Sequence, residues 1–291
     1  MSINVAAPTA VPELTAEQVV RLLVKPLEDT SVVLASGVRV FDSNGSPVRV
    51  PKLGGPVDPS WHGESELIDE EDVDFSEITL LPADMASVKV LTRFSNELAR
   101  QSIVSLDAAL RDRLVTDVAS KIDRAFLAGT GALTATGKRT PVGLVNMPGV
   151  QTMSAVGAIN LDALHDAEGR ALAADVNPAR LKWFMRSGTF VAIRKLKDTS
   201  GKYLVQPDPT EAGAYRLLGH GVTVTNRLPA GFAILADMSQ VAVARDMAPS
   251  VKVLDQTFGH YDQQALRVVA RYDIGALNAE AVVVLSGITE S

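Results

Sequence analysis

The chain contains no cysteine among its 291 residues. This excludes a disulfide framework, a thiol nucleophile and any zinc or iron–sulfur site that depends on cysteine ligands. It suits a reducing cytoplasm, or a protein whose function does not depend on redox state. Aromatic residues are also scarce, at 5%. The remaining composition, 46% apolar and 21% charged, is that of a globular protein with about one to three domains.

Long hydrophobic runs and an excess of positive charge are missing as well. The longest continuous apolar stretches, such as residues 281–285, are far shorter than the roughly 18 residues that a membrane-spanning helix needs. Residues 1–10 have neither the basic residue nor the apolar stretch of a signal peptide. The formal net charge of -6 argues against sequence-independent nucleic-acid binding through clustered Lys and Arg. We therefore expect no membrane partner.

No motif that carries chemistry is complete. GxGxxG, HExxH and GxSxG do not occur. Gly131 to Arg139 resembles a phosphate loop, but the glycine spacing is wrong, no Ser or Thr follows Lys138, and the stretch follows a helix instead of a strand. The four His are scattered, and the acidic run at residues 69–72 lacks the alternating ligands of a calcium loop. We predict no catalytic, cofactor-binding or metal-binding residue.

The basic residues do not gather in one large group. Arg186, Arg194, Lys195 and Lys197 lie near one another in the sequence. We interpret them as ordinary surface charge, because surface ion pairs contribute little. The alternative is that they face acids of a neighbouring chain.

The clearest structural signal is a long amphipathic helix at residues 105–128. Ser105 is a suitable N-cap, and Gly129 stands where a left-handed cap would end the helix. At 1.5 Å per residue this helix spans about 36 Å, so we expect it to cross the subunit. Its apolar residues recur at every fourth position: Leu106, Leu110, Leu114, Val118, Ile122 and Phe126.

Strands on both sides of a second α/β body suggest an inserted domain. Residues 87–94 alternate as a half-buried strand does, and residues 265–272 and 281–285 are its expected partners. The Gly/Thr-rich residues 129–149 mark a boundary. Beyond them we predict helices at 161–174 and 187–195, and strands at 181–185, 221–225, 232–237 and 241–246.

Residues 31–84 lack the pattern of a compact core. We predict a strand at residues 31–41, a turn at 42–45 and a returning strand at 48–50. Residues 64–84 then contain nine acids and no Lys or Arg. Because a solvated loop would leave the interspersed apolar residues in water, we expect an extended β-hairpin or loop that projects from the body; an ordinary acidic loop is the alternative. Assembly is expected to cover these apolar residues: Ile68, Phe75, Ile78 and Leu80.

Taken in order, the residues resemble the major capsid protein family of tailed bacteriophages, whose fold was first described in phage Hong Kong 97 and is shared with encapsulin shells. The resemblance covers about residues 85–286. It rests on Val88-Lys89-Val90, on Arg93 to Leu98 and Ser102, on the helix exit from Ile122 to Gly131, and on Pro141-Val142-Gly143-Leu144. It continues through Leu196-Lys197-Asp198, Gly201, Tyr203-Leu204, Leu228-Pro229, Asp237, Arg271 and Asn278 to Ala281.

The resemblance implies an α+β fold of the Hong Kong 97 type, with four parts. An N-terminal arm would occupy residues 1–39, and an extended loop that reaches over an adjacent subunit would occupy residues 40–84. The peripheral domain would comprise residues 85–138 and 263–291, with a spine helix at 105–128. Residues 139–262 would form the inserted axial domain, whose tips meet at the five-fold and six-fold centres.

The implied function is structural. Copies would assemble into the pentamers and hexamers of an icosahedral phage head, inside the host cytoplasm, and would enclose double-stranded DNA without sequence-specific binding. Because only about 85 residues precede the core, we expect no built-in scaffold and no cleavage, and hence a separate scaffold protein beside the portal and a possible decoration protein. Lys52 lies in the loop, but nothing identifies a partner for a covalent cross-link.

Two alternatives remain. An encapsulin-like nanocompartment shell protein has the same fold and encloses enzymes, and the short amphipathic pattern at residues 15–23 suits its cargo-binding helix. A cytoplasmic α/β enzyme with a site between its two bodies is the alternative from another class.

Overall fold

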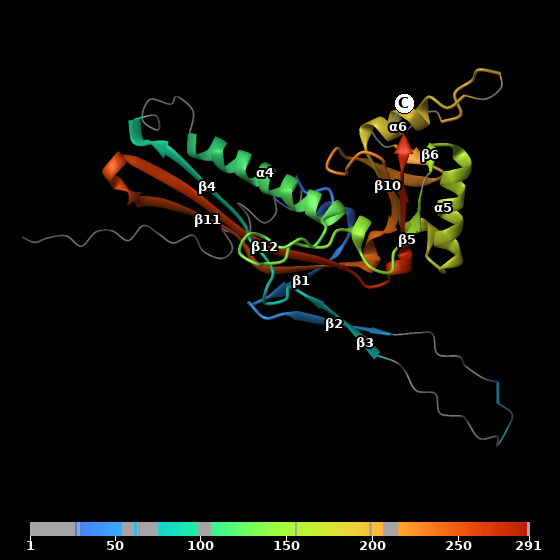
Figure 1. The fold of residues 1–291 in the computed structure, drawn as a ribbon, viewed down its shortest axis with the longest axis horizontal. Coiled ribbons are helices and arrows are strands. Elements are labelled where there is room, and N and C mark those ends of the chain that lie inside the picture. Colours follow the sequence, from blue (N-terminus) through green and yellow to red (C-terminus); the bar gives the residue numbers. More distant parts are fainter. Residues whose placement is uncertain are drawn as a thin grey trace, which may run out of the picture.

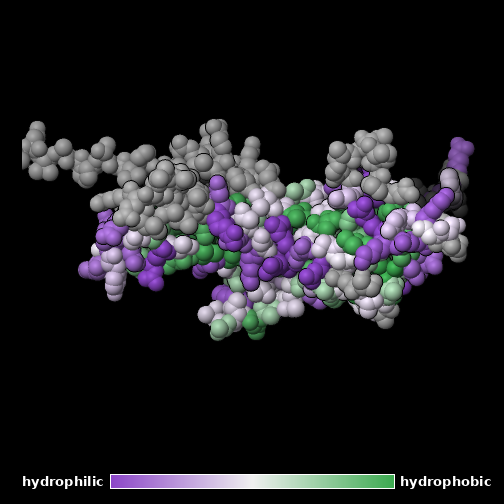
Figure 2. Space-filling view, turned by 90° about the horizontal axis from the view of Figure 1, so that it is seen from above, coloured by the Kyte–Doolittle hydropathy of each residue, from purple (hydrophilic) through white to green (hydrophobic). Residues whose placement is uncertain are grey.

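The computed structural model describes residues 27, 30–53, 61–62, 64, 75–97, 106–154, 156–197, 200–205 and 215–289. These residues form an elongated α+β molecule (Figure 1). A sheet covered by a long helix makes up one end, a second sheet with two helices makes up the other, and a hairpin projects between them. Seen from above, a band of hydrophilic side chains crosses the middle of the molecule, with hydrophobic residues visible on both sides (Figure 2).

The first sheet has the strand order β1-β11-β12-β4. Its long central pair, β11 and β12, is antiparallel and continues through two register shifts. β4 joins β12 antiparallel, as the alternation of residues 87–94 predicts, and β1 joins β11 parallel. The bounds are β1 (Arg39–Ser43), β4 (Val88–Ser95), β11 (Val241–Phe258) and β12 (Gln263–Ala276), with η6 (Gly259–Tyr261) closing the long pair.

The predicted long helix is present as α4 (Leu106–Ala128) and covers one face of this sheet (Figure 1). Leu114, Val118, Ile122 and Phe126, four residues apart, are all buried, because side chains at this spacing share one face of a helix. Ser105 and the side chains of residues 106–111 lie outside the described part of the chain. On the wet face, Arg113 Nε lies 3.0 Å from Asp117 Oδ2, as the spacing predicts.

Gly129 ends α4, but not through the left-handed cap that we predicted. Its φ is not positive, and its N–H donates to the Ala125 carbonyl at 2.8 Å. Instead, Gly129 and Gly143 touch backbone to backbone where the chain crosses the helix end, with Gly143 N–H donating to the Gly129 carbonyl at 2.9 Å. A Cβ on either glycine would lie within 3.0 Å of backbone atoms. Close approach, not a left-handed conformation, is therefore the reason for glycine here.

The second sheet has the strand order β5-β13-β10-β7-β9-β8. Its central strands β7, β10 and β13 are mostly apolar and largely buried, with Trp183 and Phe184 fully buried, as expected for strands covered on both faces. The strands are β5 (Gln151–Met153), β7 (Leu181–Met185), β8 (Arg216–Leu217), β9 (His220–Val224), β10 (Phe232–Asp237) and β13 (Val282–Ser286). The helices are α5 (Leu161–Ala173) and α6 (Ser187–Arg194), both as predicted to within a residue.

Short elements connect these parts. β6 (Gly157–Ala158) pairs in parallel with β14 (Ile288–Thr289). The 3-10 turns are η2 (Leu34–Ser36), η3 (Leu144–Asn146), η4 (Pro178–Arg180), η5 (Met238–Gln240) and η7 (Ala279–Ala281).

The division into arm, loop, peripheral and axial domains stays a prediction, but the sheets do not follow its borders. β11 falls inside the predicted axial range, yet it pairs with β12 and β1 in the first sheet. β13 was expected to join β4, yet it lies between β10 and β5 in the second sheet. The reason is that β13 is buried on both faces, which suits the interior of the second sheet and not the half-exposed first sheet.

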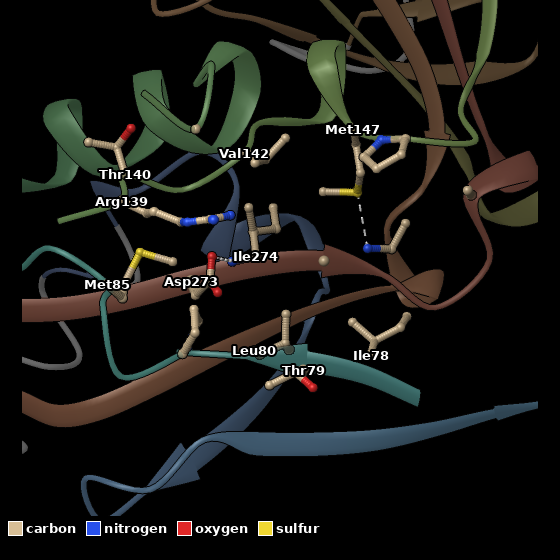
Figure 3. Close-up of a pocket in the computed structure, with 16 residues that line it drawn as sticks. Ile78, Thr79, Leu80, Met85, Arg139, Thr140, Val142, Met147, Asp273 and Ile274 are labelled. Carbon is tan, nitrogen blue, oxygen red and sulfur yellow. Dashed lines mark hydrogen bonds between the residues drawn. The ribbon is translucent and has the colours of Figure 1, made fainter. Parts of the chain in front are cut away.

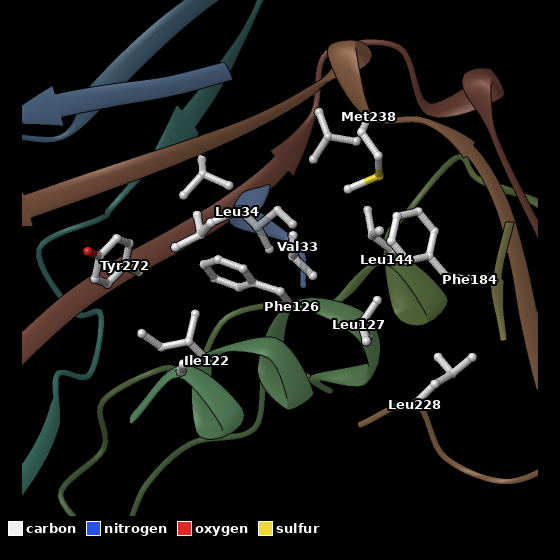
Figure 4. Close-up of a cluster of buried hydrophobic side chains, with 14 of the residues drawn as sticks. Val33, Leu34, Ile122, Phe126, Leu127, Leu144, Phe184, Leu228, Met238 and Tyr272 are labelled. Carbon is white, nitrogen blue, oxygen red and sulfur yellow. The ribbon is translucent and has the colours of Figure 1, made fainter. Parts of the chain in front are cut away.

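One hydrophobic core joins the two sheets (Figure 4). Phe184 of β7 and Tyr272 of β12 belong to the same buried cluster as Phe126 of α4. The space between the two bodies, where the enzyme alternative would place its site, is thus filled by packed side chains. The outer face of the second sheet has its own core with α5 and α6.

The segment before β1 departs from the sequence-based expectation. We predicted a strand at residues 31–41, but only Arg39–Ser43 is a strand, and Leu34–Ser36 is a 3-10 turn that ends at Gly37 with φ 99°. Val33 and Leu34 insert into the core beside α4 (Figure 4). A strand there would need a sheet edge, whereas the turn lets the backbone N–H groups reach a buried carboxylate of α4, as described below.

Candidate functional site

The projecting hairpin is the first feature suited to contact another molecule. β2 (Val48–Leu53) and β3 (Phe75–Leu80) pair antiparallel, from Val48 opposite Leu80 to Leu53 opposite Phe75. The hairpin leaves the body beneath the first sheet (Figure 1). The prediction of a projecting hairpin thus holds for the described strands, although β2 pairs with β3 and not with the strand before it. Most of the acidic loop, including Ile68, and the side chain of Lys52 lie outside the described residues.

The base of this hairpin is buried in its own subunit. Leu80 and Leu81 are each 2% exposed and pack against Ala242 and Ala244 of the first sheet. The face they cover is opposite to α4. Gly275 of β12 leaves the space for Leu80, because a Cβ there would lie 2.7 Å from a Leu80 methyl group. Our expectation that Leu80 stays exposed until assembly is therefore wrong; Ile78 beside it is half-buried.

Polar contacts hold the same base. Asp273 Oδ2 accepts a hydrogen bond from the Leu81 N–H at 2.9 Å. Arg271 Nη2 donates to the Pro82 carbonyl at 2.9 Å, while its Nη1 bonds to Asp246 at 2.9 Å. A hollow of about 370 Å³ lies beside these contacts, and Asp273 is one of the residues that line it (Figure 3). The hairpin is thus joined to β12 by apolar packing and by two directed bonds, while Asp246 of β11 holds Arg271 in place.

Burial raises the pKa of Asp273 above its ordinary value, and this outweighs the lowering by the N–H groups of Leu81 and Ile274 and by Arg271. Asp42 behaves in the opposite way. The hydrogen bond from Arg245, 2.6 Å long, lowers the pKa of Asp42 below its ordinary value. The two carboxyls lie on opposite faces of the first sheet and titrate in different windows.

We expect Asp273→Asn and Asp42→Asn to change the pH dependence of stability in opposite directions. A raised pKa in the folded state means that the contribution of Asp273 is largest below its unfolded pKa of about 3.9 and falls as pH rises through the raised value. The lowered pKa of Asp42 means that its contribution is present above about pH 3.9 and is lost on further acidification. The free energy of unfolding, measured with urea for the wild type and both variants from pH 3 to pH 7, tests this expectation.

The stability difference between wild type and Asp273→Asn should shrink or reverse as pH rises. For Asp42→Asn the difference should grow as pH rises above 3. If the free energy of unfolding changed with pH in the same way in all three proteins, the pKa directions given for Asp273 and Asp42 would both be contradicted.

A second feature, which the sequence reading missed, is a cluster around Asp123 of α4. Asp123 is fully buried. It accepts hydrogen bonds from Ser31 Oγ at 2.5 Å, from the N–H groups of Val32 and Val33, and from Arg227 Nη1 at 2.8 Å. Arg227 also donates to the Thr30 carbonyl and to Ser120. This Asp123 cluster ties together the chain before β1, the long helix and the loop after β9.

A signal for this cluster was present in the sequence. Asp123 follows Ala119 by four residues and precedes Leu127 by four, so it lies in a buried row of the helix. A carboxylate in such a row must have partners, because an unpaired buried charge is very costly. The identity of the partners was not visible, because Ser31 and Arg227 are 92 and 104 residues away.

The far end of the second sheet carries cations beside aromatic rings. Arg194 lies over the ring of Phe190 at 5.8 Å, and Lys197 lies over the ring of Tyr203 at 4.9 Å. Tyr203 and Leu204 are about half exposed. Two of the four cations noted in the sequence thus lie in a surface that also offers apolar area, a composition suited to protein contacts.

The other residues considered for chemistry do not converge. Gly131 and Gly137 have positive φ in an exposed turn. His165 and His220 both contact Glu168, at 3.7 and 3.0 Å. Within the described ranges, no group of three or more His, Asp or Glu is placed to hold a metal ion. The helices described here include none that is both long and apolar enough to cross a membrane.

Comparison with known proteins identifies relatives. The chain is 25% identical to a protein called major capsid protein of Halomonas phage phiHAP-1, over 88% of this chain and 40% of that protein. It is 22% identical to the major capsid protein of Klebsiella oxytoca phage phiKO2, over 99% of this chain and 71% of that protein. The chain therefore spans less than half the length of the Halomonas phage relative.

Solved structures show the same fold. One, described as the capsid of a native GTA particle, matches 88% of this chain and 90% of its own with a TM-score of 0.70 at 19% identity. Another, from Microbacterium phage Oxtober96, matches 98% of this chain and 96% of its own with a TM-score of 0.71 at 16% identity. These matches confirm the predicted Hong Kong 97-type fold. Because the model of the phage capsid family matches residues 13–287, the chain belongs to the phage capsid family.

Proposed function

We propose that this chain is the structural subunit of a phage head and not an enzyme. In this proposal, copies join into pentamers and hexamers of an icosahedral shell that encloses double-stranded DNA. The proposal is supported by membership of the phage capsid family over residues 13–287. A portal protein, a separate scaffold protein and a decoration protein are the further partners proposed, with assembly in the host cytoplasm.

The observation that carries the proposal is the hairpin with a buried base. A hairpin of two strands is marginally stable alone, yet β2 and β3 extend away from the body (Figure 1). Their base is held by Leu80, Leu81 and Arg271, so the hairpin has a defined direction. A projecting arm with a fixed direction is suited to a shell, because each subunit must reach its neighbour in the same way to close a ring.

Assembly of the purified full-length chain tests this proposal. We expect sedimentation velocity to show species of five or six copies or larger, and negative-stain electron microscopy to show uniform rings or polyhedral particles. Repetition of modest contacts around a ring supplies the required avidity. A single monomeric species at the highest soluble concentration, with and without a co-expressed scaffold candidate, would exclude the proposal.

A further inference from the structure

One asparagine of this chain is followed by glycine. Eight asparagines occur in the sequence, and only Asn44 has a glycine, Gly45, as its next residue. The backbone nitrogen that follows an asparagine can attack the side-chain amide carbon of that asparagine. A glycine leaves this nitrogen unshielded and its backbone free to rotate, because it has no Cβ. The dipeptide is therefore suited to a covalent change that needs no enzyme.

Asn44 and Gly45 lie in the connection between β1 and β2. β1 belongs to the first sheet and β2 to the projecting hairpin, so residues 44–47 join two separate sheets. The ladder between β1 and β11 ends at Ser43, and the ladder between β2 and β3 begins at Val48. The residues between these ladders thus have no strand partner that would hold their backbone.

The connection is open to water. Asn44 and Gly45 are both exposed, and the chain bends here without a hydrogen-bonded turn. Gly45 has a φ of 88°, and a Cβ added to it would meet no atom within 4 Å. The contact across the bend is the hydrogen bond from the Ser43 hydroxyl to the Ser46 carbonyl. Neither packing nor a described backbone bond therefore keeps the Gly45 nitrogen away from the Asn44 side chain.

The other asparagines that the structure describes are held by their side chains. The side-chain oxygens of Asn160, Asn177 and Asn278 accept hydrogen bonds from backbone N–H groups two or three residues later. This capping geometry directs the side-chain carbonyl away from the nitrogen of the next residue. The remaining three are bonded to other side chains or to backbone carbonyls: Asn96, Asn146 and Asn226. Asn44 has no comparable bond to a described residue.

We propose that Asn44 is a site of spontaneous deamidation. The Gly45 nitrogen forms a bond to Cγ of Asn44 and gives up its proton to water or hydroxide, while the bond from Cγ to the amide nitrogen breaks and ammonia leaves. Water then opens the resulting cyclic imide at either of its two carbonyls, which yields aspartate or isoaspartate. Overall, water is consumed and ammonia is released, with no oxidation or reduction.

The product changes the connection between the body and the hairpin. Deamidation adds a negative charge two residues after Asp42, whose carboxylate accepts a hydrogen bond from Arg245 at 2.6 Å. Isoaspartate also inserts a methylene group into the main chain between the two sheets. The chain thus acquires a mark of its age at this connection. The inference goes beyond the proposed function and does not depend on it.

Incubation of the full-length protein at neutral and at mildly alkaline pH tests the proposal. Digestion at acidic pH and tandem mass spectrometry then follow each asparagine. We expect the peptide with Asn44 to gain the mass difference between an amide and a carboxyl group, in separable aspartate and isoaspartate forms. This gain should be several-fold faster than at the other described asparagines. The rate should rise with pH, because a base removes the Gly45 proton.

Two variants at the site give the expected losses. Gly45→Ala should slow the reaction several-fold, because a Cβ shields the attacking nitrogen and restricts the backbone. Asn44→Gln should abolish the mass gain at this position, since the longer side chain closes the ring poorly. Both positions are exposed with open space around Gly45, so we expect both variants to fold.

Ala279→Gly is the matched control, because it places a glycine after Asn278, whose side-chain oxygen accepts the Glu280 N–H at 3.1 Å. In this variant Asn278 should still deamidate several-fold more slowly than Asn44. Equal rates at the two sites would show that restraint of the side chain does not matter and would overturn the inference. It would also be overturned if Asn44 stayed intact in the folded protein under conditions in which the urea-unfolded chain deamidates there.

Discussion

Replacing Asp123 by alanine is expected to destabilise the subunit by about 3–5 kcal/mol. The substitution leaves the Arg227 guanidinium, which is largely buried, without its carboxylate. It also removes the acceptor of Ser31 Oγ and of two backbone N–H groups, and unsatisfied buried donors are costly. Urea unfolding of the unassembled chain measures the loss.

Asp117→Ala is the matched control for this experiment. Asp117 lies on the same helix, is half exposed and forms an ion pair with Arg113, a contact that contributes roughly 0.3–0.5 kcal/mol. The segment before β1 should also lose hydrogen-exchange protection in Asp123→Ala, because the amides of Val32 and Val33 lose their acceptor. A cost for Asp123→Ala no larger than for Asp117→Ala would show that the Asp123 cluster does not stabilise the fold.

Gly143→Ala is expected to cost about 3 kcal/mol or more, since inserting a methyl group into a packed site typically costs 1–3 kcal/mol even where side chains can move. Here the added Cβ would meet backbone atoms of Ala125, Ala128 and Gly129 within 3.0 Å. These atoms belong to the end of α4 and cannot rotate away. The change should lower the urea midpoint and shift the end of the helix.

Gly169→Ala is expected to have the opposite effect on stability. Gly169 lies inside α5, is exposed and has open space where a Cβ would be added. Alanine is favoured over glycine in a helix by about 1 kcal/mol, so Gly169→Ala should raise the stability. If both substitutions changed the free energy of unfolding in the same direction, the close approach between Gly129 and Gly143 would not be a constraint of the fold.

The comparison of these two glycines illustrates where sequence reasoning succeeded and failed. A glycine at a helix end predicts a left-handed cap from local statistics, and Gly129 was read in that way. Its actual role depends on Gly143, which is 14 residues later and crosses the helix end. No local pattern reports which backbone segments will touch.

The strands show the same contrast: the sequence predicted where most of them lie but not which strands pair. The strands at β4, β7, β10 and β12 were predicted from alternation or apolar runs, because burial of a face leaves a periodic trace in the sequence. The assignment of β13 to the first sheet was wrong, since an apolar run shows that a strand is buried but not which strands lie beside it. The extension of β11 to Phe258 was also missed, because its irregular register obscures the alternation.

The candidate site was predicted in part. Acid content and the lack of core pattern indicated a projecting segment, and the strands β2 and β3 bear this out. The burial of Leu80 and the bonds of Asp273 and Arg271 could not be foreseen, since Leu80 and Gly275 are far apart in the chain.

By itself, the amino-acid sequence determined the long helix, most strands, the acidic projecting segment and the resemblance to the phage capsid family. Each of these depends on residues close together in the chain, where periodicity and charge are directly visible. The tertiary structure decided the sheet partners, the Asp123 cluster and the buried base of the hairpin. Those features depend on contacts between residues separated by tens to hundreds of positions, and such contacts are selected by packing and hydrogen-bond satisfaction over the whole subunit.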